Sequence, residues 1–399
     1  MAKGNAFRQI WLVLLPRLPT DISLSTLKIA YGPGLTRGLR LAAEASYGSP
    51  NIIIDIAIAC DDGLIIEYSI LQGLFGLMYR LICAICTEHQ IDILYGNDID
   101  ARLVLLRHTQ YLSTASAKPR ISIIDLKTLA KTDREWQRIL SLEGEDAETL
   151  LRDFIRLRDE SFHHAVQEAQ VERLPGGLTV RHDPPKNVLA HGNVFRRYQS
   201  VAVGGTFDHL HAGHKLLLTM AALVLDPEAT EGSCLTVGIT GDALLKKKQY
   251  QEELEDFFER QSAVQSFLLG ILELMSPDHI LEKTQKATSS ESFGREIHDT
   301  LKSGLIIKYV EIFDPCGPTI TDEAISALVL SAETRSGGQI VNDKRRDKGW
   351  TVLEVLEVDV LDFGDEETSQ TDDKFQSKIS STDIRRRVHQ KSAQANEKS

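Results

Sequence analysis

The sequence reads GGTFDHLHAGH from Gly204 to His214, between a strand-like run, Tyr198–Val203, and a helix-favouring stretch, Lys215–Leu225. A loop that joins a strand to a helix lies at the carboxyl edge of a parallel sheet, where α/β folds bind ligands. The two glycines let the backbone approach an anion closely, and the first turn of the helix offers free N–H groups to it. This stretch therefore predicts an anion-binding site within an α/β domain.

Three side chains in this stretch can reach such an anion. Thr206 supplies a hydroxyl donor, and His211 and His214 are three residues apart, so both can face a ligand from the first helical turn. Imidazoles in this position either coordinate a metal or donate hydrogen bonds to phosphate oxygens. The sequence has no paired carboxylates or cysteines at ligand spacing nearby, which favours phosphate. A metal-sensing cluster of His209, His211 and His214 is the weaker alternative.

The rest of the second half repeats the pattern of strand, turn and helix. A long amphipathic helix is expected over Gln251–Met275. Because helix-length segments separate most of the strands, we expect a parallel sheet with right-handed crossovers. We interpret the polar stretch Lys283–Ser303 as a long connector and the acidic stretch Asp362–Lys378 as a mobile loop. Besides Tyr198–Val203, the expected strands are Ser233–Thr240, Tyr309–Phe313, Leu328–Ser331 and Val352–Val360.

The first half also alternates strands with helices. Strands are expected at Asn51–Ala59, Ile91–Tyr95 and Arg120–Leu126, and a charged helix over Glu145–Val171. This pattern predicts a second α/β unit. The sequence shows no catalytic constellation in this half.

One apolar stretch of the first half, Leu64–Cys86, has the length of a membrane span. Glu67, Gln72 and Arg80 interrupt it, and charged groups at bilayer depth are costly. We therefore expect a buried core helix. The apolar run Ile10–Leu15 is too short for the core of a signal peptide.

A composition shift divides the two halves. The segment Leu174–Lys186 contains Pro175-Gly176-Gly177 and Pro184-Pro185, which cannot continue a helix. We expect an N-terminal domain over residues 1–173, a linker over 174–195, a second domain over 196–392 and a disordered tail over 393–399. Disorder is expected to begin near Gln390.

Composition narrows the function classes. The chain has 399 residues and a net charge of -12, which argues against coating nucleic acid, since phosphate backbones attract excess Lys and Arg. Five cysteines are too few and too scattered for a disulfide framework, which fits a reducing compartment. We expect a cytoplasmic protein, with the nucleus not excluded, that contacts neither nucleic acid nor membrane.

Residues 204–214 resemble the His-x-Gly-His signature of the nucleotidyltransferase superfamily, in the form found in eukaryotic, fungal-type phosphopantetheine adenylyltransferases. Four further segments agree with that family in the same order, and together the matches cover roughly half of the chain, residues 196–392. These segments are Gly241–Lys248, Glu259-Arg260, Ser331–Gly338 and Ile379–Arg385.

The resemblance implies a Rossmann-like, parallel-sheet nucleotidyltransferase domain that follows the N-terminal α/β domain. The implied enzyme transfers AMP from ATP to 4′-phosphopantetheine by in-line attack without a covalent intermediate, giving dephospho-coenzyme A and pyrophosphate. The attacking phosphate is already ionised at neutral pH, so the site needs positioning and charge stabilisation in place of a general base. Mg²⁺ is implied as an ion that accompanies ATP.

The same resemblance implies roles for individual residues. His214, His211, Lys247 and Arg335 are the expected catalytic residues, although three adjacent lysines leave the choice of Lys247 open. Helix capping is the simpler alternative role for the hydroxyl groups of residues 380–382. The acceptor phosphate is expected to contact Thr206, Lys246, Lys247 and Lys248. The residues expected to bind ATP are Gly205, Thr206, Phe207, His211, His214, Arg335, Ser380, Ser381, Thr382 and Arg385.

Two alternative functions stay open. Another nucleotidyltransferase, such as a cytidylyltransferase, shares the His-x-Gly-His and Ser-Ser-Thr motifs, although Ser331–Gly338 favours the phosphopantetheine branch. A nucleotide-binding regulatory or scaffold protein without turnover is the other, because the first half has no visible chemistry. That half is the expected platform for protein partners, with enzymes of the coenzyme A pathway as candidates. No Gly-x-x-x-x-Gly-Lys-Ser/Thr loop is present, so we expect a monofunctional enzyme.

Overall fold

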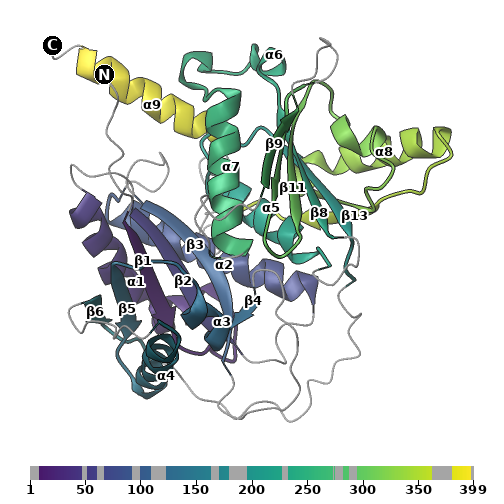
Figure 1. Cartoon of the computed structure of the whole chain (residues 1–399). Helices are drawn as coiled ribbons and strands as arrows, with labels where there is room; N and C mark the ends of the chain where they lie inside the picture. The colour runs from purple at the N-terminus through teal and green to yellow at the C-terminus, as the bar shows by residue number, and fades with distance from the viewer. Residues whose placement is uncertain are drawn as a thin grey trace. The chain divides into compact units, whose positions relative to one another are not determined.

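The computed structural model of the chain divides into two compact units (Figure 1). Unit 1 comprises Met1–Phe195 with Glu273–Met275, and unit 2 comprises Arg196–Leu272 with Ser276–Ser399. The structure describes residues 9–46, 52–60, 67–91, 99–108, 123–162, 170–178, 196–226, 232–272, 274, 282–286, 294–361 and 380–396.

Unit 1 contains a six-stranded sheet in which every pairing is parallel, in the order β4-β3-β2-β1-β5-β6. This confirms the predicted α/β character of the first half. The central strand, β1, is the apolar run that is too short for a signal peptide, and five of its six residues are buried. The strands are β1 (Ile10–Leu15), β2 (Ile52–Cys60), β3 (Ile99–Arg107), β4 (Ile123–Asp125), β5 (Arg138–Leu142) and β6 (Val171–Leu174).

Among the described residues of unit 1, four helices accompany this sheet: α1 (Leu24–Ser46), α2 (Tyr68–Glu88), α3 (Leu126–Lys131) and α4 (Glu145–Phe162). Among the described residues, α2 is the one helix long and apolar enough to cross a membrane. It has 67% of its apolar window buried, and it packs against α1. That burial is what the prediction of a core helix requires.

Several boundaries in unit 1 differ from the prediction. The helix expected over Glu145–Val171 ends at Phe162, and Val171 begins β6 instead. The strand expected over Arg120–Leu126 is limited to β4 within the described residues, because the Asp125 side chain accepts a hydrogen bond from Thr128 N and starts α3. Ile91 lies outside any strand, and the remainder of the strand expected at Ile91–Tyr95 lies outside the described residues.

The linker expected from residue 174 does not begin there. Leu174 is fully buried in β6, which pairs with β5. The next two glycines pack tightly against unit 1, because a Cβ on Gly176 would overlap the Glu143 carbonyl and one on Gly177 the Ile29 carbonyl. Unit 1 therefore continues through these glycines, and residues 179–195 lie outside the described residues.

Unit 2 contains a seven-stranded sheet in the order β13-β12-β7-β8-β11-β10-β9. The first five strands of that order pair in parallel, which confirms the predicted Rossmann-like sheet. The chain starts at the centre of the sheet with β7 and β8, crosses to the edge strand β9 and returns inward through β10 to β11. It then passes to β12 and β13 on the other side of β7. The strands are β7 (Ser200–Gly205), β8 (Cys234–Thr240), β9 (Glu282–Lys286), β10 (Glu296–Thr300), β11 (Ile306–Ile312), β12 (Ala327–Ser331) and β13 (Glu354–Val358).

The helices of unit 2 cover both faces of this sheet. In Figure 1, α7 lies on one side of the strands and α8 on the other. Ala202, Leu328 and Leu330 point toward Val341 of α8, while α5 packs against α7. The helices are α5 (Ala212–Leu223), α6 (Asp242–Leu245), α7 (Phe257–Leu272), α8 (Arg335–Asp347) and α9 (Ser381–Asn396), with short 3₁₀ helices η3 (Gln251–Glu253), η5 (Gly317–Ile320) and η6 (Ala332–Thr334).

Three segments of unit 2 differ from the prediction. The polar stretch interpreted as a connector contains β9 and β10, which extend the sheet in antiparallel register. The tail expected to be disordered is helical as far as Asn396, because α9 continues past the expected domain end at residue 392. The helix expected over Gln251–Met275 begins only at Phe257, after η3. The predicted mobile loop, Asp362–Lys378, lies outside the described residues.

Candidate functional site

A cleft of about 530 Å³ opens at the carboxyl ends of β7 and β12, within unit 2. These two strands flank the point where the strand order reverses, which is where ligands bind in open α/β sheets. One end of the cleft is polar, and its lining includes Gly205, Thr206, His211, His214, Lys248, Ser380, Ser381, Thr382 and Arg385. The structure therefore brings together nine of the residues that the sequence predicted.

The first turn of α5 faces the polar end. His211 is the N-cap residue, and its Nδ1 accepts a hydrogen bond from the Gly213 N–H at 3.2 Å. An Nδ1 that accepts a hydrogen bond carries no proton, so the proton of the neutral His211 ring lies on Nε2. The helix end thus presents both a fixed imidazole tautomer and backbone N–H groups to an anion.

The second histidine stacks on the first. The rings of His211 and His214 are parallel within 22°, with their centroids 3.9 Å apart, and Phe207 packs edge-on against His214 at 5.4 Å. Burial, with a smaller effect of His209, lowers the pKa of His214 to about 3. The buried Nδ1 of His214 has no hydrogen-bond partner among the described residues. His214 is therefore a neutral ring at pH 7.

Phe207 supports the cleft from below and does not line it. Its side chain is fully buried, and a Cβ on Gly205 would contact the Phe207 ring at 3.1 Å. Phe207 and His209 both have left-handed backbone conformations, with φ of 55° and 47°. Such conformations are unfavourable for residues other than glycine and are held by surrounding contacts. We conclude that the structure gives Phe207 a packing role beneath the two histidines.

A buried arginine of α7 joins the ends of β7 and β8. Arg260 donates to the carbonyl oxygens of Thr206 and Thr240, both at 2.8 Å, and to Asp242 Oδ1 at 2.6 Å. Its guanidinium is fully buried, so it positions backbone and does not meet solvent. These bonds fix the backbone of Thr206, the residue that follows the two glycines.

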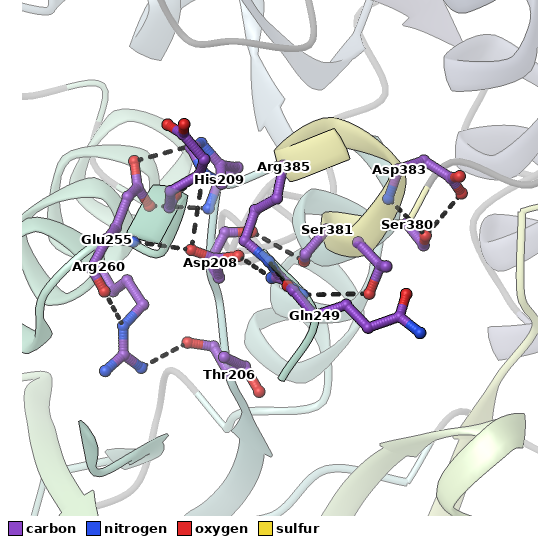
Figure 2. A network of polar contacts seen from close by, with 12 residues as sticks. Thr206, Asp208, His209, Gln249, Glu255, Arg260, Ser380, Ser381, Asp383 and Arg385 are labelled. Atoms are coloured by element: carbon purple, nitrogen blue, oxygen red, sulfur yellow. Dashed lines mark hydrogen bonds and ion pairs between the residues drawn. The ribbon is translucent and has the colours of Figure 1, made fainter. Parts of the chain in front are cut away.

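Asp208 lies at the centre of a second buried network (Figure 2). Its carboxylate forms an ion pair with Arg385 and accepts a hydrogen bond from Glu255 N at 3.0 Å. Arg385 also donates to the Gln249 carbonyl at 2.9 Å and to Thr382 Oγ1 at 3.1 Å. Three of the five N–H groups of Arg385 are thus occupied within the protein. The structure gives Arg385 a structural role at the cleft wall, and its phosphate contact stays a prediction from the sequence.

The three hydroxyl groups at the start of α9 are also engaged. Ser380 Oγ donates to Asp383 and accepts from Asp383 N–H, which is a helix cap of the kind considered from the sequence. Ser381 Oγ donates to the Asp208 carbonyl at 2.9 Å, and Thr382 Oγ1 accepts from Arg385. The Thr382 hydroxyl proton and the first backbone N–H groups of α9 are the groups left for an anion.

The structure separates the three adjacent lysines. Lys248 lines the cleft, whereas Lys246 and Lys247 do not, although all three are exposed. The helix α6 ends at Leu245, and the Lys248 N–H bonds back to the Leu245 carbonyl at 2.9 Å. That turn directs the third lysine toward the cleft. Lys248 is therefore better placed than Lys247 for the acceptor role.

Arg335 does not line the cleft. It begins α8 with 70% of its side chain exposed, and its Nη2 is 2.6 Å from Glu357 Oε2. The hydrogen bond to Glu357 raises the pKa of Arg335. Neighbouring residues from the same segment, Ser331 and Gly337 among them, do line the cleft. A phosphate contact by Arg335 requires its guanidinium to leave Glu357.

The other end of the cleft is apolar and spans the face of the sheet that carries Ala202. Gly204 lies on its floor, where a Cβ would meet no atom closer than 3.9 Å. Apolar walls beside a polar anion site suit a ligand with both a phosphate chain and a flat or apolar part. Its walls include Ile312, Cys316, Pro318, Val341, Val358 and Leu361. Within the described ranges, no group of three or more His, Cys, Asp or Glu side chains could hold a metal ion.

Sequence reasoning missed Asp208 and the roles of the two buried arginines. Asp208 lies within the stretch Gly204–His214, but we assigned it no role because a carboxylate would repel a phosphate bound nearby. The rule that could have identified these roles is that a buried arginine needs a carboxylate or several carbonyl oxygens as partners. Nothing in the sequence shows that Arg385 and Arg260 are buried, so this rule could not be applied in advance.

Comparisons with known proteins agree with this geometry. Residues 202–387 match the family model described as cytidylyltransferase-like, and residues 1–180 match one described as a domain of unknown function, DUF8446. An uncharacterized protein of Schizosaccharomyces pombe is 36% identical over 46% of this chain and 46% of its own length. A phosphopantetheine adenylyltransferase of Saccharomyces cerevisiae is 32% identical over 56% of this chain and 55% of its own length. Another of that name, from Pyrobaculum aerophilum, is 29% identical over 48% of this chain and 92% of its own.

The match with the first two relatives spans about half of their length. Together these findings support the nucleotidyltransferase superfamily for the C-terminal half of the chain. Membership of this superfamily implies binding of a nucleotide and a second substrate.

Proposed function

We propose that unit 2 is a phosphopantetheine adenylyltransferase, which transfers AMP from ATP to 4′-phosphopantetheine. One observation carries the proposal: the first turns of α5 and α9, two stacked histidines and Lys248 converge on one cleft at the switch point of the sheet. The relatives named phosphopantetheine adenylyltransferase support this choice of substrate over other nucleotidyltransferase reactions. They are the reason for preferring ATP to CTP, since the family model itself is described as cytidylyltransferase-like.

The proposed reaction forms one bond and breaks one. An oxygen of the acceptor phosphate attacks the α-phosphorus of ATP, and the bond from that phosphorus to the bridging oxygen breaks, so that pyrophosphate leaves. Negative charge grows on the transferred phosphoryl group during this step. Donors that are already in place stabilise this charge without reorganisation.

His211 and His214 are the proposed donors at the α-phosphate. His211 carries its proton on Nε2 because Gly213 N–H occupies Nδ1. His214 is a neutral imidazole, so it contributes a hydrogen bond and not a positive charge in the empty cleft. Two neutral donors at a helix N-terminus can hold a phosphoryl group without the tight ground-state pairing that a cation would form.

Other residues are proposed to hold the ends of the two substrates. Lys248 pairs with the acceptor phosphate beside Thr206, and it replaces Lys247 as the favoured lysine because it lines the cleft. The first turn of α9, with the Thr382 hydroxyl, binds the β- and γ-phosphates. The apolar end of the cleft then receives the base.

Mg²⁺ is proposed to enter with ATP, where it neutralises charge on the phosphate chain. The donors that line the cleft are imidazoles, hydroxyls, cations and backbone N–H groups, with Glu333 and Asp359 as its carboxylates. This set suits phosphate oxygens better than a bare cation. The protein's own part is therefore to orient the phosphates.

The test is pyrophosphate release from the full-length chain with ATP and Mg²⁺, in the presence and absence of 4′-phosphopantetheine. CTP is the control nucleotide, and His214→Ala is the control variant. We expect release that needs both ATP and the acceptor. Release with CTP in place of ATP would favour a cytidylyltransferase, and binding of ATP without release would favour the regulatory alternative.

A further inference from the structure

We propose that Asp208 is a positioning residue that holds α9 against the β7–α5 loop and so builds the end of the cleft that takes the outer phosphates of ATP. This inference rests on the proposed use of the cleft by a nucleoside triphosphate. Asp208 itself does not line the cleft, and its side chain is fully buried. Any effect of Asp208 on a ligand must therefore act through other residues.

Asp208 connects three segments that are distant in the sequence. One carboxylate oxygen accepts from Glu255 N, which precedes α7, and the other pairs with Arg385 of α9. The backbone carbonyl of the same residue accepts from Ser381 Oγ at 2.9 Å. Figure 2 shows these contacts meeting at Asp208, with Arg385 lying between Asp208 and Gln249. The side chain and the main chain of one residue thus both bind the N-terminal part of α9.

Arg385 extends the connection toward the lysine segment. Its Nε donates to the carbonyl of Gln249, the residue after Lys248, and its Nη2 donates to Thr382. Arg385 is only 1% exposed, so loss of the Asp208 charge leaves a buried guanidinium without its counter-ion. Arg385 directly follows the first turn of α9 and donates to Thr382 within it, so we expect this turn to shift when the counter-ion is lost.

The backbone on both sides of Asp208 shows how closely its position is specified. Phe207 and His209 both have positive φ, and His209 is held by Glu255 through its N–H at 2.7 Å and by the Glu253 carbonyl through its ring at 2.8 Å. Two unfavourable backbone conformations, one on each side of Asp208, persist only where surrounding contacts enforce them. They turn the Asp208 side chain inward while His211 and His214 face the cleft.

The test compares Asp208→Asn with the unaltered full-length chain. Asparagine keeps the acceptor for Glu255 N–H and the side-chain shape but removes the charge opposite Arg385. We expect the dissociation constant for ATP to rise about tenfold or more, the range for losing one or two charged hydrogen bonds, while that for AMP changes much less. AMP lacks the two outer phosphates, so the ratio of the two constants isolates the α9 end of the cleft.

Two further variants separate positioning from general destabilisation. Asp55→Asn breaks a comparable buried pair in unit 1, where Asp55 accepts from Arg134 and from Trp136 Nε1. That variant should lose stability but keep the ratio of ATP to AMP affinity. The pair Asp208→Asn with Arg385→Gln removes both charges and leaves two amides that can bond, so it should recover part of the ATP affinity.

A second readout does not depend on any nucleotide. Amide hydrogen exchange over Ser380–Arg387 should become faster in Asp208→Asn, with no such change in Asp55→Asn. Unchanged exchange in this segment would overturn the proposal that Asp208 holds α9. Faster exchange with an unchanged ATP-to-AMP ratio would overturn the link to phosphate binding. Wild-type protein that binds ATP but forms no pyrophosphate would refute the proposed function and leave this inference standing on both readouts.

Discussion

The two stacked histidines combine a helix cap with a ligand site. His211 caps α5 by accepting the Gly213 N–H, which a serine or aspartate does more often, so its ring proton lies on Nε2. His214 lies between that ring and Phe207, and burial there keeps it neutral. The spacing of these residues was visible in the sequence. The stacking of the two rings and the burial that keeps His214 neutral involve Phe207, which packs against His214. The sequence did not show that Phe207 is buried.

The lowered pKa of His214 predicts how stability depends on pH. The folded protein holds the ring neutral down to about pH 3, whereas an unfolded histidine takes up a proton near pH 6.5. Between these values the unfolded state binds more protons, so the free energy of unfolding falls as the pH is lowered from 6.5 toward 3. Above pH 7 this histidine adds no pH dependence.

Replacing this histidine should remove that part of the pH dependence. His214→Gln should flatten the loss of the free energy of unfolding between pH 7 and pH 5, measured by urea unfolding at each pH. His389→Gln is the matched control, because His389 is 46% exposed and outside the cleft. The assignment is wrong if both variants follow the wild-type slope.

The position of the lysines predicts which one the reaction needs. Lys248→Ala should lower kcat/KM for the acceptor by about 100-fold, the order of magnitude for losing a positioning charge, whereas Lys247→Ala should change it by less than about fivefold. Steady-state kinetics with 4′-phosphopantetheine as the varied substrate measure this difference. The two variants remove the same charge from adjacent exposed positions, so each is the control for the other. A larger loss in Lys247→Ala would restore the choice made from the sequence.

At the scale of elements, apolar runs revealed the parallel strands of unit 2, whereas β9 and β10 were missed because their sequences are polar. In β10 the residues that point inward are Ile297 and Asp299. The Asp299 carboxylate accepts from Gln265 Nε2, so a charged residue lies on the buried face of a strand. A pattern based on hydrophobic alternation cannot register such a position. In unit 1, β1 and β6 are short strands whose pairing partners lie far along the chain.

Two adjacent glycines at the start of α8 have different roles. A Cβ at Gly337, which lines the cleft, would meet no atom within 4 Å. A Cβ at Gly338 would come within 3.0 Å of Val355 and 3.1 Å of Leu330. Gly337→Ala should therefore keep or raise Tm, since alanine favours a helix by up to about 1 kcal/mol, but weaken ATP binding. Gly338→Ala should lower the free energy of unfolding by roughly 1 kcal/mol through overpacking.

Thermal unfolding and ATP titration of both alanine variants check this pair. The expected pattern is opposite: binding changes in Gly337→Ala, and stability in Gly338→Ala. If Gly337→Ala bound ATP normally, the start of α8 would not contact the nucleotide, and the case for phosphate binding by the neighbouring Arg335 would weaken as well.

For the whole molecule, composition together with the clustered prolines and glycines indicated two α/β parts, and a cleft lies in one of them where the sequence predicted a ligand site. The boundary was placed too early because Pro175, Gly176 and Gly177 are typical of linkers. In the structure these glycines pack against carbonyl oxygens of unit 1. Glycine is used in proteins for such close backbone packing as well as for flexible linkers. Close backbone approach and chain flexibility produce the same residue type, so the sequence could not distinguish them.

If Mg²⁺ binds only together with ATP, a chelator should affect the turnover of the protein but not its thermal stability. The described residues contain no cluster that could hold a metal ion, and the polar groups that line the cleft are mainly ones that bind phosphate. EDTA should therefore abolish turnover while leaving Tm of the nucleotide-free protein unchanged, because a metal that binds only with ATP adds nothing to the stability of the empty protein. Excess Mg²⁺ should restore turnover fully. A fall in Tm on adding EDTA, reversed by zinc but not by magnesium, would instead support a resident metal and return weight to the histidine cluster as its ligand set.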